Sequence, residues 1–440
     1  MKTEPRTLPG FMELLPSEQI LFNQMKKTIE ESYQKFGFLP IDTPIIELSE
    51  VLLAKAGGET EKQIYRFNKG ETDLSLRFDL TVPLAKFVAK NYNDLSFPFR
   101  RYQIGKVYRG EKAQKGRYRE FYQCDIDIIG DGELSIINDA ELPVVISTTF
   151  KNLGFSNFTI KINNRKILNG LYEGLGQKEN SVDIMRIIDK IDKIGEEKVR
   201  KEISELGVSN EIVDKLVSFI KINGTTDEKL AKLDEMNIEN ETYQKGVNEL
   251  KDVIKYIRMF GLPEENFTVD FTIARGLDYY TGTVYETFLN EYRELGSVCS
   301  GGRYENLAEN YTDKKLPGVG ISIGLTRLFY KLNELGLIKA TKKSVADVLI
   351  VPMMDDMKEA IALGTNLRAA GINTEIYLND KKIKAKMKYA DRLKIPYVIV
   401  VGENEVQANK LKVKNMETGE EKEASFDAEE IKALIKCWKM

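Results

Sequence analysis

The densest group of side chains that could do chemistry lies between residues 99 and 127. Two strand-like runs, Phe99–Arg109 and Tyr118–Ile129, flank a basic loop, and the stretch contains five arginines: Arg100, Arg101, Arg109, Arg117 and Arg119. A guanidinium stays charged and its forked donors match phosphate oxygens, so arginines held on strands are suited to clamp a triphosphate. Phe121 could stack on a purine ring. For any single arginine, a solvent-facing charged hairpin is the alternative.

The chain contains no histidine, and this excludes much chemistry. Ser-His-Asp and Cys-His catalysis are impossible, and a zinc site would lack its commonest ligand. The three cysteines, Cys124, Cys299 and Cys437, lie far apart, which argues against a disulfide framework or a zinc cluster. Any mechanism must therefore use arginine, lysine, carboxylates, hydroxyls and Mg²⁺, and we expect no metal ligands among the site residues.

The composition is that of an ordinary soluble protein, with 42% hydrophobic and 30% charged residues. A net charge of −3 means that any grip on RNA must come from local basic patches. Met1–Gly10 has no apolar core, so we expect no signal peptide, and the longest apolar runs are too short to span a membrane. These features predict a cytoplasmic protein.

Hydrophobic spacing predicts the elements that would hold these residues. A helix opens at Pro16–Ser17 and ends at Gly37, and another covers Val82–Lys90. Strand-like runs surround them, at Leu74–Phe78 and in the two arginine-bearing segments. This order predicts an antiparallel sheet with helices on one face.

Three changes in the spacing of hydrophobic residues divide the rest of the chain. Residues 170–261 have helical spacing, strand-like sequence returns over 262–335, and strands alternate with helices over 336–440. We therefore expect a helical insertion, a second part of the sheet that begins in 1–169, and a C-terminal α/β domain with a mostly parallel sheet. Five lysines near Lys381–Leu393 form either a solvated helix face or an RNA-contacting surface: Lys381, Lys382, Lys384, Lys386 and Lys388.

Several of these segments resemble the motifs of class II aminoacyl-tRNA synthetases. The stretch from Phe99 to Asp127 looks like motif 2, Leu316–Leu328 looks like motif 3, and Phe36–Pro44 fits the looser motif 1. Three further stretches resemble the histidyl-tRNA synthetase family: Arg275–Glu286, Ser300–Tyr304 and Leu76–Pro83. The resemblance covers nearly the full length. Asp79-Leu80-Thr81 stands where many bacterial members have Glu-Gly-Thr.

The resemblance implies an α+β fold: a class II antiparallel sheet flanked by helices, a helical insertion and a C-terminal α/β anticodon-binding domain. Residues 1–169 and 262–335 would be the two parts of the catalytic core, 170–261 the insertion and 336–440 the anticodon-binding domain. The implied activity is ATP-dependent ligation of L-histidine to its tRNA, tRNA(His), through a histidyl-adenylate, with release of AMP and pyrophosphate. ATP would be a substrate and Mg²⁺ its companion ion. A homodimer in the cytoplasm is also implied.

The resemblance assigns five residues to ATP. Arg109 would hold the α-phosphate, Glu111 and Arg117 would contact the adenine and the outer phosphates, and Phe121 would stack on adenine. Arg327 would take the γ-phosphate. Arg109 would also be catalytic, because it neutralises charge at the reacting phosphorus.

Six further residues are implied around histidine, and Arg275 is implied at the α-phosphate. Asp79 and Thr81 would bind the α-amino group, with Gln123 beside it. Asp127 and Tyr280 would hydrogen-bond the imidazole, and Tyr304 would line the same pocket. Arg275 would be a second catalytic cation on the α-phosphate. Core packing is the alternative for Tyr280, and a structural ion pair is the alternative for Arg101 and Arg303.

Three other interpretations are open. The regulatory subunit of ATP phosphoribosyltransferase resembles this catalytic core, but it would lack the C-terminal domain and have degraded motif 2 and Arg275 positions. A class II enzyme for another amino acid does not account for Arg275–Glu286. A plain RNA-binding module does not account for two separate ATP-type motifs.

Overall fold

In the computed structural model, two units are separated near residue 336. The structure describes residues 2–54, 59–112, 116–188, 191–273, 280–305 and 308–439. Met1–Met12 and Met25–Leu335 form the larger unit, and Glu13–Gln24 with Gly336–Met440 form the smaller one. Each unit has its own sheet.

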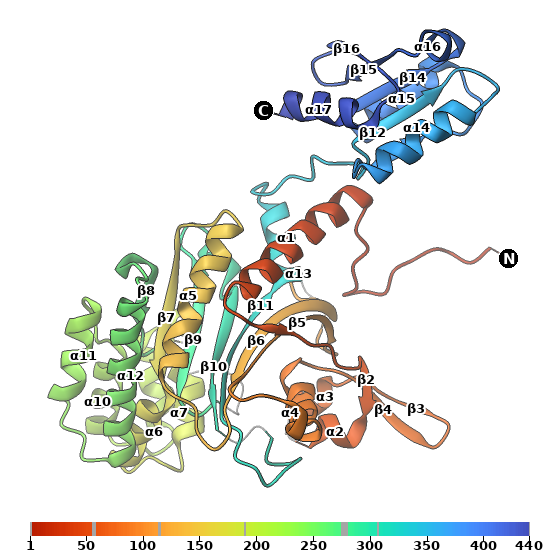
Figure 1. Cartoon of the computed structure of the whole chain (residues 1–440). Helices are drawn as coiled ribbons and strands as arrows, with labels where there is room; N and C mark the ends of the chain where they lie inside the picture. Colours follow the sequence, from red (N-terminus) through yellow and green to blue (C-terminus); the bar gives the residue numbers. More distant parts are fainter. Residues whose placement is uncertain are drawn as a thin grey trace. The chain divides into compact units, whose positions relative to one another are not determined.

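An eight-stranded sheet runs through the larger unit in the order β1-β5-β6-β11-β10-β9-β7-β8 (Figure 1). Its strands are β1 (Leu39–Pro40), β5 (Phe99–Tyr108), β6 (Glu120–Ile129), β7 (Phe158–Asn164), β8 (Phe267–Val269), β9 (Thr283–Leu289), β10 (Cys299–Tyr304) and β11 (Gly318–Gly324). The pairings are antiparallel except at the two edges, where β1 pairs with β5 and β7 with β8 in parallel. The predicted antiparallel sheet is confirmed.

Helices cover one face of this sheet, chiefly α5 (Ile137–Asn152), with α1 (Pro16–Gln34) and α13 (Leu325–Glu334) nearby (Figure 1). Buried polar contacts fix α5 there: Arg303 of β10 forms an ion pair with Asp139 at 2.6 Å, and Tyr285 donates to the Asp139 carbonyl. Tyr33 of α1 donates to the carbonyl of Cys124. Successive side chains of a strand point to opposite faces of the sheet. The strand residues that alternate with those facing α5 and α1 therefore point to the face that these helices leave uncovered.

A smaller, three-stranded sheet with order β2-β4-β3 precedes β5 in the chain. The elements here are β2 (Ile46–Leu48), α2 (Ser49–Leu53), α3 (Glu59–Gln63), β3 (Arg66–Lys69), β4 (Thr72–Leu76), α4 (Thr81–Lys90) and the 3₁₀ turn η1 (Tyr92–Asp94). The buried Arg77 ties this part to the large sheet, because its side chain donates to the carbonyls of Lys106 and Thr43. The loop from β4 to α4 is thereby held against β5.

The segment between β7 and β8 is helical. Its helices are α6 (Arg165–Gly174), α7 (Ser181–Ile188), α8 (Ile191–Ile194), α9 (Glu196–Ser204), α10 (Asn210–Ile220), α11 (Thr226–Glu235) and α12 (Glu241–Met259). Short turns η2 (Glu264–Asn266) and η3 (Arg293–Leu295) lie farther along the larger unit. Gly246 lets α12 approach α6, since a side chain there would overlap the backbone of Ile167.

The smaller unit contains a five-stranded sheet in the order β13-β12-β14-β15-β16. Its elements are β12 (Val348–Pro352), α14 (Lys358–Ala369), β13 (Thr374–Ile376), α15 (Ile383–Leu393), β14 (Tyr397–Val401), α16 (Glu403–Ala408), β15 (Leu411–Asn415), β16 (Glu421–Ala424) and α17 (Ala428–Lys439). β12 pairs in parallel with β13 and β14, but β14–β15 and β15–β16 are antiparallel. The expected mostly parallel sheet was therefore wrong for its second half, where a short turn at Gly419 makes a hairpin.

The lysine-rich helix also differs from expectation. Lys381 and Lys382 precede α15, which begins at Ile383. Lys386 is buried and its ammonium donates to the carbonyl of Pro352 at 2.6 Å. It cannot contribute to an RNA-binding face, whereas Lys384 and Lys388 are exposed.

Candidate active site

The uncovered face of the large sheet carries a row of polar side chains. Gln123, Asp125 and Asp127 alternate on β6 with residues that point toward the helices. Across from them lie Arg101, Gln103 and Gly105 on β5, and Gly324, Ser322 and Gly320 on β11. The glycines provide space for the longer neighbours: a side chain at Gly320 would overlap Asp127, and one at Gly318 would overlap the ring of Tyr304. This explains why the motif 3 strand is rich in glycine.

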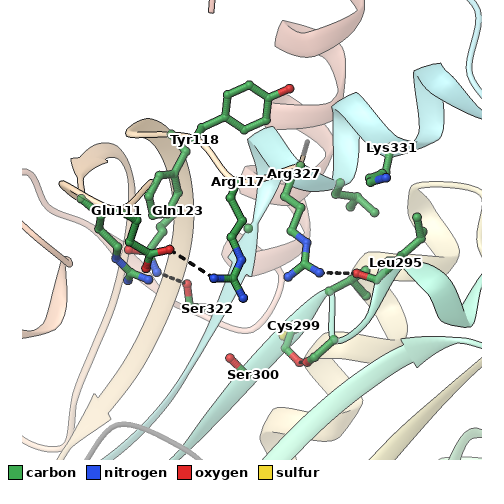
Figure 2. Close-up of a pocket in the computed structure, with 17 residues that line it drawn as sticks. Glu111, Arg117, Tyr118, Gln123, Leu295, Cys299, Ser300, Ser322, Arg327 and Lys331 are labelled. Carbon is green, nitrogen blue, oxygen red and sulfur yellow. Dashed lines mark hydrogen bonds and ion pairs between the residues drawn. The ribbon is translucent and has the colours of Figure 1, made fainter. Parts of the chain in front are cut away.

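A cavity of about 320 Å³ opens at one end of this face (Figure 2). Six of the residues assigned from the sequence line it: Arg109, Glu111, Arg117, Phe121, Gln123 and Arg327. Its polar lining also includes Tyr118, Ser297, Ser300, Ser322 and Lys331. The cavity thus gathers three arginines and a lysine from motifs more than 200 residues apart, as an anionic ligand would require.

The arginines of this cavity have different local supports. Arg109 lies between two aromatic rings, 4.4 Å from the centre of Phe78 and 5.1 Å from that of Phe121. Arg117 is 3.5 Å from the Glu111 carboxylate, and Arg327 donates to the carbonyl of Leu295 (Figure 2). Burial, and then the charge of Arg117, lowers the pKa of Arg327. Two like charges in one cavity favour a polyanion that can bind both.

Behind the cavity, the floor of the site is buried and strongly polar. Arg101, fully buried, forms an ion pair with Asp127 at 2.5 Å, and the Tyr304 hydroxyl donates to the other oxygen of Asp127 at 2.9 Å. Burial raises the pKa of Asp127 to about 6, although Arg101 and Tyr304 lower it. Burial likewise raises the pKa of Asp125 to about 7. Arg101 was set aside as a structural ion-pair partner; its partner proves to be a candidate ligand-binding residue.

The residues assigned to the amino group lie at the start of α4. Asp79 and Thr81 are buried, and the Asp79 carboxylate accepts hydrogen bonds from the backbone N–H groups of Thr81 and Val82 at 3.1 and 2.9 Å. Burial raises the pKa of Asp79, while those bonds and the charges of Arg109 and Arg101 oppose the rise. Asp79 therefore shares one electrostatic environment with the cations of both the cavity and the floor.

Tyr280 completes the described part of the floor. Its ring lies close to Gly302 of β10, where an added Cβ would be 3.0 Å away, and it packs against the buried cluster that contains Tyr304 and Leu84. Its backbone carbonyl accepts a hydrogen bond from Arg165. Arg275 lies outside the described residues.

Asp125 and Ser322 are among the residues of the site that were missed from the sequence. Both face the same side as Gln123 and Asp127, and the Gln123 amide donates to Ser322 at 2.8 Å (Figure 2). The spacing Gln123-x-Asp125-x-Asp127 is a signal that could have included Asp125, because alternate residues of a strand share a face. No local pattern could have paired it with Ser322.

Comparisons with known proteins agree with this geometry. Residues 10–328 match the family model described as Histidyl-tRNA synthetase, and residues 347–438 match the Anticodon binding domain. The chain belongs to the histidyl-tRNA synthetase family. A histidine–tRNA ligase of Clostridium tetani is 60% identical over 96% of this chain and 97% of its own length, and that of Clostridium acetobutylicum is 48% identical over 97% and 99%. The crystal structure of the Nostoc sp. PCC 7120 histidyl-tRNA synthetase has a TM-score of 0.90 and 40% identity, covering 98% of this chain and all of that one.

The chain is thus a ligase of the aminoacyl-tRNA synthetase class that charges tRNA with histidine and uses ATP as a substrate. The match to an anticodon-binding domain covers the C-terminal domain that the regulatory subunit was expected to lack. Among the helices of the described ranges, none has both the length and the apolar character needed to cross a membrane.

Proposed function

We propose that the cavity binds ATP, that the buried floor binds histidine, and that the two react there to form histidyl-adenylate and pyrophosphate. The observation that carries the proposal is the continuity of β6. Gln123 lines the cavity, and the same strand face continues to Asp127 in the buried floor. An amino acid whose carboxylate lay near Gln123 would therefore meet the α-phosphate of a nucleotide in the cavity.

ATP binding rests on complementarity of charge and shape. Arg109 would hold the α-phosphate and Arg327 the γ-phosphate, with Arg117 and Glu111 contacting the outer phosphates and the adenine. Phe121 would stack on adenine once Arg109 leaves its ring to meet the phosphate. Arginine is suited to both positions, because it stacks on aromatic rings and forks onto phosphate.

Histidine recognition rests on the polar pairing in the floor. An imidazole offers two nitrogens, and Asp127 and Tyr280 would each bind one, with Tyr304 lining the pocket and orienting Asp127. An apolar side chain of similar size would form no hydrogen bond with Asp127 or Tyr280, so it would bind more weakly than an imidazole. Asp79, Thr81 and Gln123 would bind the α-ammonium group.

The first step requires a positioned nucleophile and neutralised charge. The histidine carboxylate attacks the α-phosphorus of ATP, the new P–O bond forms, and the bond to the bridging oxygen breaks so that pyrophosphate leaves. Arg109 would stabilise the added negative charge, and Arg275 is proposed as a second cation on the same phosphate. In the second step a ribose hydroxyl of the tRNA end attacks the acyl carbon and AMP leaves. We propose a phosphate oxygen of the adenylate as the base.

Mg²⁺ is proposed as the companion ion of ATP. Mg²⁺ commonly binds through substrate phosphates, one or two carboxylates and water. Glu111 is the carboxylate of the cavity lining that could assist. Such an ion neutralises phosphate charge.

The domain roles are also part of the proposal. Residues 1–169 and 262–335 would form the catalytic core, 170–261 the insertion, and 336–440 the part that binds the anticodon of tRNA(His). The second unit beginning at Gly336 and the family match over 347–438 support the last of these. A homodimer and a cytoplasmic location stay predictions from the family resemblance.

The direct test is amino-acid-dependent exchange between ATP and pyrophosphate, with each of the twenty amino acids in turn. Histidine alone is expected to stimulate exchange in the absence of tRNA, because adenylate formation precedes transfer. Exchange that required tRNA, or that another amino acid stimulated equally, would overturn the two-step proposal. Arg109→Ala should abolish exchange while the protein stays folded by circular dichroism.

A further inference from the structure

A buried hydrogen-bond chain lies behind the proposed amino-group site. The side-chain amide of Gln123 donates to the Ser322 hydroxyl oxygen at 2.8 Å. Ser322 stands directly opposite Asp125 in the β6–β11 pairing, on the same face of the sheet, and its hydroxyl lowers the pKa of the Asp125 carboxyl. Gln123 and Ser322 line the cavity, whereas Asp125 does not. Asp125 is 3% exposed and lies behind Gln123 and Ser322 as seen from the cavity.

In this series of hydrogen bonds, the donor and the acceptor of each bond can be assigned. Above its pKa of about 7 the Asp125 carboxylate is ionised and only accepts hydrogen bonds, so the Ser322 hydroxyl that faces it would donate to it. Its oxygen is then available to accept, and the NH₂ end of Gln123 donates to it. The other end of that amide, Oε1, is buried without a hydrogen-bond partner. An unpartnered buried acceptor is costly unless a ligand donor meets it.

We propose that Asp125 is a positioning residue that acts through Ser322 to aim the carbonyl oxygen of Gln123 at the α-ammonium group of bound histidine. This inference rests on the proposed function, which places the ammonium group beside Gln123. The carboxylate at position 125 fixes the direction of the Ser322 hydroxyl, and the Ser322 oxygen then fixes the orientation of the Gln123 amide. The amide presents its carbonyl oxygen to the ammonium group. Asp125 itself touches no substrate.

Without a negative charge at position 125, the direction in which the Ser322 hydroxyl donates would no longer be fixed. An asparagine at position 125 can donate to Ser322, whose hydroxyl can then turn toward Gln123. The Gln123 amide would be free to present its NH₂ end, which repels an ammonium group. Charged groups that interact with Asp125 are Arg101 on β5, Asp127 on β6 and Asp79 before α4. The titratable groups of Tyr33, Cys124 and Cys299 interact with it as well. Gln103 on β5 and Ser322 on β11 are the neutral neighbours opposite it.

The test compares histidine with its analogue 3-(imidazol-4-yl)propionate, which lacks the amino group. Asp125→Asn should raise the KM for histidine in ATP–pyrophosphate exchange about tenfold, the effect of losing one hydrogen bond to a charged group. The inhibition constant of the analogue and the KM for ATP should change by less than about twofold, since neither involves the ammonium group. Ser322→Ala should act like Asp125→Asn, and the double variant should be no worse than Ser322→Ala alone.

Asp139→Asn is the matched control, because it removes a buried carboxylate from the helix-covered side of the same sheet. It is expected to lower the unfolding temperature without changing the ratio of the histidine KM to the analogue's inhibition constant. Equal weakening of histidine and analogue by Asp125→Asn, or additive effects in the double variant, would overturn the inference. If Asp125→Asn fails to fold, the same ratio in Ser322→Ala decides. Failure of the proposed function would appear separately, as no histidine-dependent exchange in the unmodified enzyme.

Discussion

Replacement of Asp125 by asparagine should change how the stability of the larger unit depends on pH. The carboxyl is 3% exposed, and burial raises its pKa from the ordinary 3.8 to about 7. A carboxyl whose pKa is raised on folding contributes stability that is fully present below pH 3.8 and is lost as the pH rises toward 7. The variant has no proton to lose at this position, so this part of the pH dependence should disappear.

The magnitude follows from the two pKa values. Between pH 6 and pH 8, linkage gives a loss of ~1.4 kcal/mol in the free energy of unfolding from Asp125 alone. The contributions of Asp127 and Asp79 are common to both proteins, so they cancel to first order when the variant is compared with the parent. The free energy of unfolding of Asp125→Asn, relative to the parent, should therefore rise by ~1.4 kcal/mol from pH 6 to pH 8.

Urea unfolding followed by near-ultraviolet circular dichroism of the tyrosines is the assay, at pH 6, 7 and 8. The chain has one tryptophan, Trp438, which lies in the smaller unit. Its fluorescence therefore serves as an internal control and should show no pH-dependent difference between the two proteins. A relative stability that stays constant from pH 6 to pH 8 in the tyrosine signal would refute the reasoning, because Asp125 would then be ionised throughout.

Three other perturbations have defined outcomes. Gly320→Ala should destabilise the enzyme by ~1–3 kcal/mol in urea unfolding, because its Cβ would overlap Asp127. Gly324→Ala is the control, because nothing lies within 4 Å of the added Cβ. Equal destabilisation by the two substitutions would contradict the packing argument. Tyr304→Phe should raise the pKa of Asp127 above about 6, because the hydrogen bond from the Tyr304 hydroxyl lowers it. The acid limb of the pH profile of kcat/KM for histidine should therefore shift to higher pH. An unshifted acid limb would show that Asp127 does not take part in histidine binding. Phe121→Ala should raise the KM for ATP by about tenfold, as loss of one stacked base predicts, with little change in the histidine KM. Equal changes in both would remove Phe121 from the adenine site.

Strand and helix positions in the catalytic part followed from local pattern. The strands predicted at Phe99–Arg109 and Tyr118–Ile129 appear as β5 and β6, and the helix predicted at Val82–Lys90 appears as α4, with ends displaced by two residues or fewer. Alternation and helical spacing are properties of adjacent residues, so one sequence is enough to detect them. The six assigned residues that line one cavity came from the family resemblance and not from this periodicity.

What could not be predicted depends on contacts between distant segments. The partner of Asp125 is Ser322, about 200 residues away, and nothing in either neighbourhood indicates their pairing. Lys386 looked like part of a charged face because its type favours solvent, yet its ammonium finds the Pro352 carbonyl of β12. The antiparallel half of the C-terminal sheet was missed because β15 and β16 are short and charged. Each case was decided by tertiary pairing.

The chain contains no histidine, so its acidic groups with pKa values near neutrality are of particular interest. Among the described carboxyls, Asp125 and Asp127 have pKa values near neutrality, at about 7 and about 6, where a histidine would ordinarily titrate. Both owe this to burial in the floor of the site. The enzyme that recognises an imidazole thus holds carboxyls whose protonation changes in the imidazole's own pH range.

A crystal structure of the enzyme with a non-hydrolysable sulfamoyl analogue of histidyl-adenylate would test the central claim most directly. We predict that the imidazole lies between Asp127 and Tyr280, and that the α-ammonium group meets Asp79 and the Oε1 atom of Gln123. The adenine should stack on Phe121, with Arg109 moved from the Phe121 ring to the group that replaces the α-phosphate. An analogue whose imidazole lies away from Asp127, or whose ammonium group faces the NH₂ end of Gln123, would contradict the account.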